Sequence, residues 1–267
     1  MQELLSKPVD VVWIASYPRS GNTWVRFLLY AFLHGPIGAA MDVGRAIPNL
    51  HRGAEIRPAL EKAGPGERMI IKTHTLPVPQ HPLIGRTRAF IYIMRHPKDV
   101  LLSGINIHQR SGMQLNELHY AMSFIKNGGD IVWNKYGFGW WEQHADAWLA
   151  RPRWPHTVVR YEDLVKDPRG PLAEMARVLG VEPAAERIEA AIANASFERM
   201  RELEEQDQGK SLADGLFQKP GDPNKVRTFV NKGKTGRMLA GNVPGAGPEL
   251  DAQFDARFGV ALRKYGY

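Results

Sequence analysis

Residues 9–33, VDVVWIASYPRSGNTWVRFLLYAFL, constrain the fold more than any other part of the sequence. The apolar run from Val11 to Ala15 predicts a buried strand, and the apolar residues after Gly21 recur at helical spacing. A short polar loop therefore joins a strand to a helix. Because the first N–H groups of a helix are unpaired and lie at the positive end of its dipole, such a loop is a typical anion-binding site.

The side chains of this loop favour a phosphate as the anion. Gly21 lets a ligand approach the backbone closely, Ser20 and Thr23 add hydroxyl donors, and Arg19 adds a permanent positive charge. The loop lacks the lysine of the ATP- and GTP-binding pattern GxxxxGK[ST], because Asn22 follows Gly21. The simpler alternative is a strand, a turn and a helix with incidental polar residues.

Composition narrows the class of protein without choosing a ligand. The chain has 267 residues, 43% of them hydrophobic and 24% charged, which suits one α/β domain over residues 1–267. A net charge of +7 favours anionic partners: nucleic acid, a membrane surface or a small polyanion. The absence of cysteine excludes disulfides and thiolate sites. Because neither a signal-like N-terminus nor a bilayer-spanning apolar run is present, we expect a cytoplasmic protein without a membrane span.

Two basic side chains lie at the C-terminal end of the second predicted strand, residues 68–72. Lys72 ends this strand and His74 lies two residues further on. An isolated histidine is more often structural than catalytic. In open α/β sheets, however, ligands bind at the carboxyl ends of the strands, which places Lys72 and His74 beside the anion loop and favours a catalytic role.

The third predicted strand, residues 89–94, is also followed by a basic side chain, that of Arg95. The helix predicted over 97–108 carries Ser103 two turns from its start, on a side that could face Arg95. The structural alternatives are a surface ion pair between Arg95 and Asp99 and a solvated Ser103.

The remaining periodicity completes an alternation of strands and helices. We predict a fourth strand over 157–161, a surface connection over 34–50, and helices over 54–63, 114–126, 139–150, 171–179, 184–195, 197–205 and 248–264. The tryptophan-rich stripe of 139–150 is typical of core packing, with the edge of a pocket as the alternative. Polar residues 206–230 predict a lid loop, and 231–237 a basic turn. The expected architecture is a three-layer α/β fold with a mostly parallel central sheet flanked by helices.

Six sequence blocks, taken in order, extend this interpretation: SYPRSGNTW, IKTH, MRHPKDVLLS, RYEDL, NASF and FVNKG. Together they resemble the cytosolic sulfotransferase family, whose members have a P-loop-like fold. That family moves a sulfuryl group from 3′-phosphoadenosine 5′-phosphosulfate (PAPS) to an acceptor hydroxyl or amine. The resemblance runs from about Val11 to Gly233, and six ordered blocks are far more specific than any one of them.

The resemblance implies three groups of donor-binding residues. The loop Arg19, Ser20, Gly21, Asn22, Thr23 and Trp24 would bind the 5′-phosphosulfate. Arg95 and Ser103 would bind the 3′-phosphate, with Asn231, Lys232 and Gly233 closing over it. Trp24, Tyr161, Ser196, Phe197 and Phe229 would surround the adenine.

The resemblance also implies that His74 is the general base and that Lys72 and Arg19 stabilise charge. Elementary chemistry supports these roles, because sulfuryl transfer needs an in-line nucleophile and compensation of charge on the leaving oxygen. A neutral imidazole accepts the proton of the acceptor, and no metal is required.

Several positions depart from the family pattern. Arg19 stands where animal members usually carry lysine, Ala195 replaces a common hydroxyl residue, and Asn231 replaces the arginine of an RKG triplet. The last two changes should weaken donor contacts. A KTVE-type dimer motif is not visible after Gly233, so the oligomeric state is left open.

Two other functions remain as alternatives at this point. A P-loop kinase or NTPase would use a similar sheet, but the loop lacks its lysine. A non-enzymatic polyanion-binding protein would explain the charge of +7, although no nucleic-acid-binding motif supports it and we expect no nucleic-acid partner. For the sulfotransferase, the acceptor could be a small molecule, a lipid or a glycan, because the loops that would bind it carry no readable code.

Overall fold

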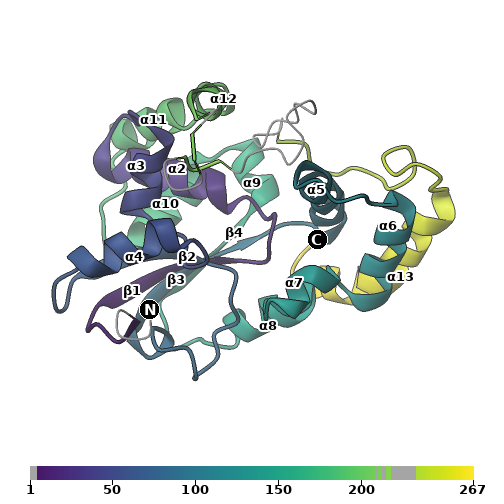
Figure 1. The fold of residues 1–267 in the computed structure, drawn as a ribbon, viewed down its shortest axis with the longest axis horizontal. Helices are drawn as coiled ribbons and strands as arrows, with labels where there is room; N and C mark the ends of the chain where they lie inside the picture. The colour runs from purple at the N-terminus through teal and green to yellow at the C-terminus, as the bar shows by residue number, and fades with distance from the viewer. Residues whose placement is uncertain (1–4, 208–209, 212–214, 218–232) are drawn as a thin grey trace.

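The computed structural model describes residues 5–207, 210–211, 215–217 and 233–267, and a four-stranded sheet lies at its centre (Figure 1). The strands are β1 (Asp10–Ser16), β2 (Arg68–Thr73), β3 (Thr87–Met94) and β4 (His156–Arg160). They lie in the order β2-β1-β3-β4, and every pair is parallel. The predicted sheet is confirmed and, within the described residues, is entirely parallel.

Strand β1 shows why helices must cover both faces of this sheet. Val11, Trp13 and Ala15 belong to one hydrophobic core, whereas Val12 and Ile14 belong to the other. Successive side chains of a strand point to opposite faces, so a strand that is apolar throughout is buried on both sides. The result is the predicted three-layer arrangement.

One group of helices packs against the core of Val12 and Ile14. It comprises α2 (Asn22–His34), α3 (Ala40–Ala46), α9 (Tyr161–Lys166), α10 (Arg169–Val178), α11 (Ala185–Asn194) and α12 (Phe197–Gln206). Helix α2 is central to this group and contacts both β1 and α11.

The second group packs against the core of Trp13 and lies on the other side of the sheet in Figure 1. It comprises α5 (Pro97–Arg110), α6 (Glu117–Asn127), α7 (Ile131–Lys135), α8 (Trp141–Leu149) and α13 (Pro248–Lys264). Helix α4 (Gly53–Lys62) contacts α3, and the short helix η1 (Ile84–Arg86) precedes β3. Trp141, His144 and Trp148 of α8 are buried, which confirms the core interpretation of the tryptophan stripe.

Two local predictions were wrong, and one helix was missed. The expected surface connection over 34–50 contains helix α3, which begins where the Asp42 carboxylate accepts the backbone N–H of Ala39. The fourth strand ends at Arg160, because Tyr161 already begins α9. Helix α7 was not predicted; it is a five-residue helix started by the carboxylate of Asp130, which accepts the N–H groups of Val132 and Trp133.

Other expectations stay open. One domain over 1–267 remains a prediction, and most of the predicted lid, residues 206–230, lies outside the described residues. Among the residues described, every helix falls short of the length and apolar character that crossing a bilayer needs.

Candidate active site

A predicted site residue follows the carboxyl end of each strand. The anion loop follows β1, His74 follows β2, Arg95 follows β3 and Tyr161 follows β4. Because the strands are parallel, these ends meet at one edge of the sheet, where a cavity of about 1520 Å³ opens. The predicted residues that line this cavity are Arg19, Gly21, Asn22, Thr23, Trp24, Lys72, His74, Arg95, Ser103, Tyr161, Phe197 and Gly233.

The loop between β1 and α2 has the geometry of an anion cradle. Gly21 has a φ of 102°, and a Cβ atom there would lie 2.3 Å from the Tyr161 ring, so glycine is required. Helix α2 begins without a side-chain cap and without an acidic residue in its first turn. The buried hydroxyl of Ser20 finds no hydrogen-bond partner among the described residues. These features suit a bound phosphate or sulfate group.

Two guanidinium groups and a hydroxyl form the end of the cavity nearest α5. Arg19 donates from Nε to the Ser103 hydroxyl at 3.0 Å, and Arg95 donates to the Arg19 carbonyl oxygen at 3.0 Å. Burial and the nearby charge of Arg95 lower the pKa of Arg19 to about 10. The buried Nε of Arg95 has no acceptor among the described residues. An anion would supply the missing counter-charge and acceptor.

The structural alternatives for Arg95 and Ser103 are wrong. Asp99 accepts from Nε of Arg237 at 3.0 Å and from the N–H of Gly236, and so does not form the expected surface pair with Arg95. Ser103 is only 6% exposed and is not a solvated helix position.

Three aromatic rings form a slot beside the loop. The ring centroids of Trp24 and Phe197 are 4.5 Å apart, and those of Trp24 and Tyr161 are 6.1 Å apart. Trp24 also donates from its indole nitrogen to the carbonyl oxygen of Ala195 at 2.9 Å. This bond uses the backbone of Ala195, so the small side chain at this position does not weaken it. Because these rings contact one another, the slot offers an apolar aromatic surface against which one side of a nucleobase can pack.

His74 is held in one tautomer. Its Nδ1 lies 2.7 Å from the carbonyl oxygen of Ser16, which only accepts, so Nδ1 carries the proton and Nε2 carries the lone pair. The side-chain nitrogen of Asn22 lies 3.4 Å from Nε2 and donates to the Ser16 hydroxyl at 3.0 Å. Burial, Lys72 and His51 hold the pKa of His74 well below its usual 6.5. His74 is therefore neutral at pH 7, as a general base must be.

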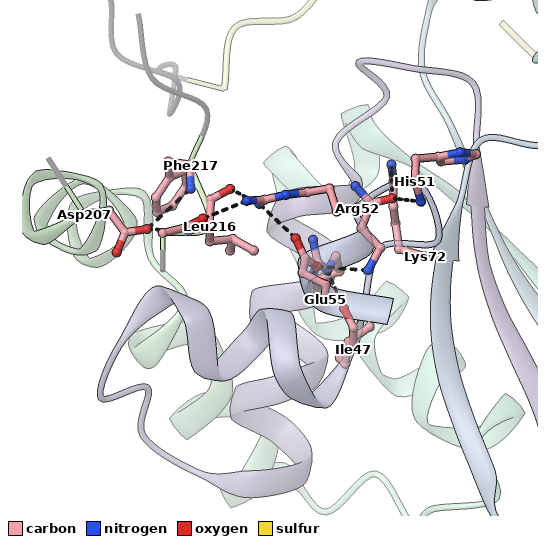
Figure 2. A network of polar contacts seen from close by, with 11 residues as sticks. Ile47, His51, Arg52, Glu55, Lys72, Asp207, Leu216 and Phe217 are labelled. Atoms are coloured by element: carbon pink, nitrogen blue, oxygen red, sulfur yellow. Dashed lines mark hydrogen bonds and ion pairs between the residues drawn. The ribbon is translucent and has the colours of Figure 1, made fainter. Parts of the chain in front are cut away.

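Lys72 is 4% exposed and is anchored by a polar network (Figure 2). Its ammonium group donates to the side-chain oxygen of Asn49 at 3.2 Å, and the backbone N–H of Asn49 donates to Glu55 at 2.9 Å. Glu55 forms a buried ion pair with Arg26 at 2.5 Å and a second pair with Arg52 at 2.8 Å. Burial, followed by the charge of Arg26, lowers the pKa of Lys72 well below 10.5.

Some predicted residues are not brought into the site. The Ser196 hydroxyl accepts the N–H of Arg199 at 3.2 Å, capping helix α12, and Ser196 does not line the cavity. Phe229, Asn231 and Lys232 lie outside the described residues. The part of the chain that the structure describes has no cluster of three metal-ligating side chains.

The fold and site define an α/β protein with an anion-binding loop beside a half-buried histidine. The sulfotransferase domain family matches residues 9–259, and the chain belongs to that family. It is 30% identical over 213 residues to mouse Sulfotransferase 1A1, and the alignment covers 76% of this chain and 70% of that protein. It is 29% identical over 203 residues to human Sulfotransferase 4A1, with coverage of 71% and 67%.

Solved structures agree on the fold. Mouse sulfotransferase SULT7A1 complexed with PAP superposes with a TM-score of 0.69 at 19% identity, covering 98% of this chain and 87% of that one. Retinol dehydratase in a complex with retinol and PAP gives a TM-score of 0.69 at 19% identity, with coverage of 96% and 82%. Family membership confirms the predicted class, a PAPS-dependent sulfotransferase, over the kinase and the non-enzymatic alternatives.

Proposed function

We propose that the chain transfers a sulfuryl group from PAPS to the hydroxyl or amine of a small-molecule, lipid or glycan acceptor by in-line displacement. One observation carries this proposal: the unprotonated Nε2 of His74 lies 3.4 Å from the side chain of Asn22 in the anion loop, and His74 lines the same cavity as Lys72. A proton acceptor and cations in one cavity support this proposal, because transfer needs both a base for the acceptor and charge compensation on the leaving phosphate. The proposal includes a cytoplasmic location, supported by the absence of cysteine.

Within this proposal, the N–H groups at the start of α2 hold the 5′-phosphosulfate. Arg19 and Lys72 stabilise the charge that develops on the leaving oxygen, and His74 takes the proton of the acceptor as the new bond to sulfur forms. Arg95 and Ser103 hold the 3′-phosphate. The adenine lies against the slot of Trp24, Tyr161 and Phe197, and the apolar character of the three rings supports this assignment.

The chemistry of the acceptor is proposed only as a class. The cavity wall near His74 includes the rings of His51 and Phe138 and the backbone around Gly53. A screen with labelled PAPS against phenols, sterols, sugars and amines tests the function, with transfer of label to at least one class expected. Transfer to none of them, together with an absence of 3′,5′-ADP binding, would contradict the proposal.

Truncation of the 3′-phosphate clamp should weaken donor binding. We expect Arg95→Ala and Ser103→Ala each to reduce affinity for 3′,5′-ADP, because a hydrogen bond to a charged group contributes about 1.5–3 kcal/mol, or roughly tenfold to a hundredfold. Calorimetric titration measures the affinity of each variant for 3′,5′-ADP. Arg153→Ala, at an exposed arginine outside the cavity, is the matched control. Unchanged affinity in both variants would remove the clamp from the proposal.

Donor binding should be coupled to proton uptake. Burial and neighbouring cations lower the pKa of Lys72 and of His74 because they disfavour the charged forms. A bound polyanion favours those forms and raises both pKa values, so protons are taken up at any pH between the free and bound values. Affinity for 3′,5′-ADP should therefore rise as the pH falls through the interval between the free and bound pKa values. Calorimetry in two buffers of different ionisation enthalpy measures the uptake; proton release would contradict this expectation.

A further inference from the structure

The turn of residues 49–52 lies against the strand end that carries both proposed catalytic residues. The backbone N–H of Lys72 donates to the carbonyl oxygen of Pro48 at 2.9 Å, and the backbone carbonyl oxygen of Lys72 accepts the N–H of Leu50 at 2.9 Å. The turn therefore extends the edge of the sheet. The side-chain oxygen of Asn49 accepts from the Lys72 ammonium at 3.2 Å and from the N–H of His51 at 3.1 Å. The turn that anchors Lys72 therefore also fixes the backbone of His51, as Figure 2 shows.

The side chain of His51 reaches the neighbouring residue of the pair. Its Nε2 lies 3.0 Å from the backbone nitrogen of His74 and accepts that N–H. The hydroxyls of Thr73 and Thr75 each lie 3.5 Å from the same nitrogen. Because an N–H group points at Nε2, this nitrogen carries the lone pair, and the proton of the neutral ring is on Nδ1.

The rings reinforce this contact. His51 and His74 are stacked with centroids 5.9 Å apart and planes inclined by 8°, and Phe138 packs at 4.8 Å from the first and 5.5 Å from the second. His51 is exposed and lines the cavity, so core packing does not account for its position. The carbonyl oxygen of His74 accepts from Nε2 of the buried His144 at 3.0 Å. The peptide groups on either side of the His74 Cα are therefore held by two other histidines.

We propose that His51 is a positioning residue for the transfer reaction, which holds the backbone of His74 so that Nε2 of His74 faces the acceptor hydroxyl. This proposal rests on the proposed function, in which His74 is the base. A displacement of about 1 Å in a reacting group is sufficient to lower turnover about a hundredfold. Loss of the His51 contact therefore affects kcat, while the donor site formed by the loop, Arg95 and the aromatic slot is left in place.

Two substitutions separate positioning from ordinary structural support. His51→Phe keeps an aromatic ring beside Phe138 but removes the acceptor for the His74 N–H. His51→Gln restores an acceptor at about the position of Nε2. His81→Phe is the matched control, because His81 also accepts a backbone N–H, from Leu83 at 3.3 Å, but does not line the cavity.

The assay is transfer from PAPS to the most active acceptor of the screen described above, with 3′,5′-ADP affinity measured separately by calorimetry. We expect His51→Phe to lower kcat about tenfold to a hundredfold, with an affinity for 3′,5′-ADP within twofold of that of the parent. His51→Gln should recover most of the lost kcat. The kcat of His81→Phe should stay within threefold of that of the parent. A kcat for His51→Phe within threefold of the parent, or equal losses for His51→Phe and His51→Gln, would overturn the proposal. Failure of the parent to transfer a sulfuryl group to any acceptor of the screen, together with an absence of 3′,5′-ADP binding, would instead count against the proposed function.

The tautomer of His51 is an independent test in the unmodified protein. Nitrogen NMR at pH 8 distinguishes a protonated from an unprotonated ring nitrogen. The proposal requires His51 to carry its proton on Nδ1, and a proton on Nε2 would contradict it, because that nitrogen could not then accept the N–H of His74.

Discussion

Replacing His74 with alanine is expected to lower kcat by about a hundredfold to ten-thousandfold, the usual contribution of a positioned general base. The substitution removes the Nε2 lone pair and leaves the anion loop, Lys72 and Arg95 in place. Affinity for 3′,5′-ADP should therefore remain within about twofold, and the effect should appear in turnover rather than in donor binding.

The matched control for this variant is His34→Ala. His34 is an exposed histidine at the far end of α2 from the anion loop, so its removal should leave turnover unchanged. Steady-state kinetics and calorimetry measure the two quantities. Near-normal kcat in His74→Ala would show that another group accepts the proton.

Replacing Glu55 with glutamine should produce the largest loss of stability, about 3–5 kcal/mol in the free energy of unfolding. The Glu55 side chain is fully buried, pairs with Arg26 and Arg52, and accepts the N–H of Asn49. The neutral amide would leave the buried Arg26 charge without a counter-ion. Because Asn49 contacts Lys72, turnover should fall as well.

Urea unfolding of Glu55→Gln and Glu189→Gln measures how much stability is lost at a buried and at an exposed ion pair. Glu189 also pairs with an arginine, Arg169, at 2.6 Å, but the two side chains are 54% and 57% exposed. An exposed pair contributes about 0–1 kcal/mol, so Glu189→Gln should change stability little. Equal, small losses in the two variants would contradict the structural role of Glu55. Replacing Arg26 and Glu55 together with Met and Leu should recover much of the loss, because the buried Arg26 charge is removed with its partner and Arg52 keeps its bonds to the carbonyl oxygens of Gly215 and Leu216.

Periodicity predicted the framework of the fold because the strongest signals are local. The apolar run of β1, the helical spacing in α2 and the stripe of α13 each reflect burial of a single element, and the structure has all three. The polar residues at strand ends could be placed in one site because parallel strands end at one edge. Lys72, His74 and Arg95 were found in this way.

The contacts that complete the site were not readable from the sequence. Asn49 lies in the predicted connection over 34–50 and His51 directly after it, and only the pairing of Asn49 with Lys72 brings them to the site. The pairing of Asp99 with Arg237 joins residues far apart in the chain. No local pattern encodes such long-range contacts, so His51, Glu55 and Arg237 were missed.

The crystal structure of a complex with 3′,5′-ADP tests the central claim most directly. We expect the 5′-phosphate to accept hydrogen bonds from the N–H groups at the start of α2, with His74 beside it. The 3′-phosphate should contact Arg95 and Ser103. A nucleotide bound elsewhere, or bound with its 5′ end far from His74, would contradict the proposed site.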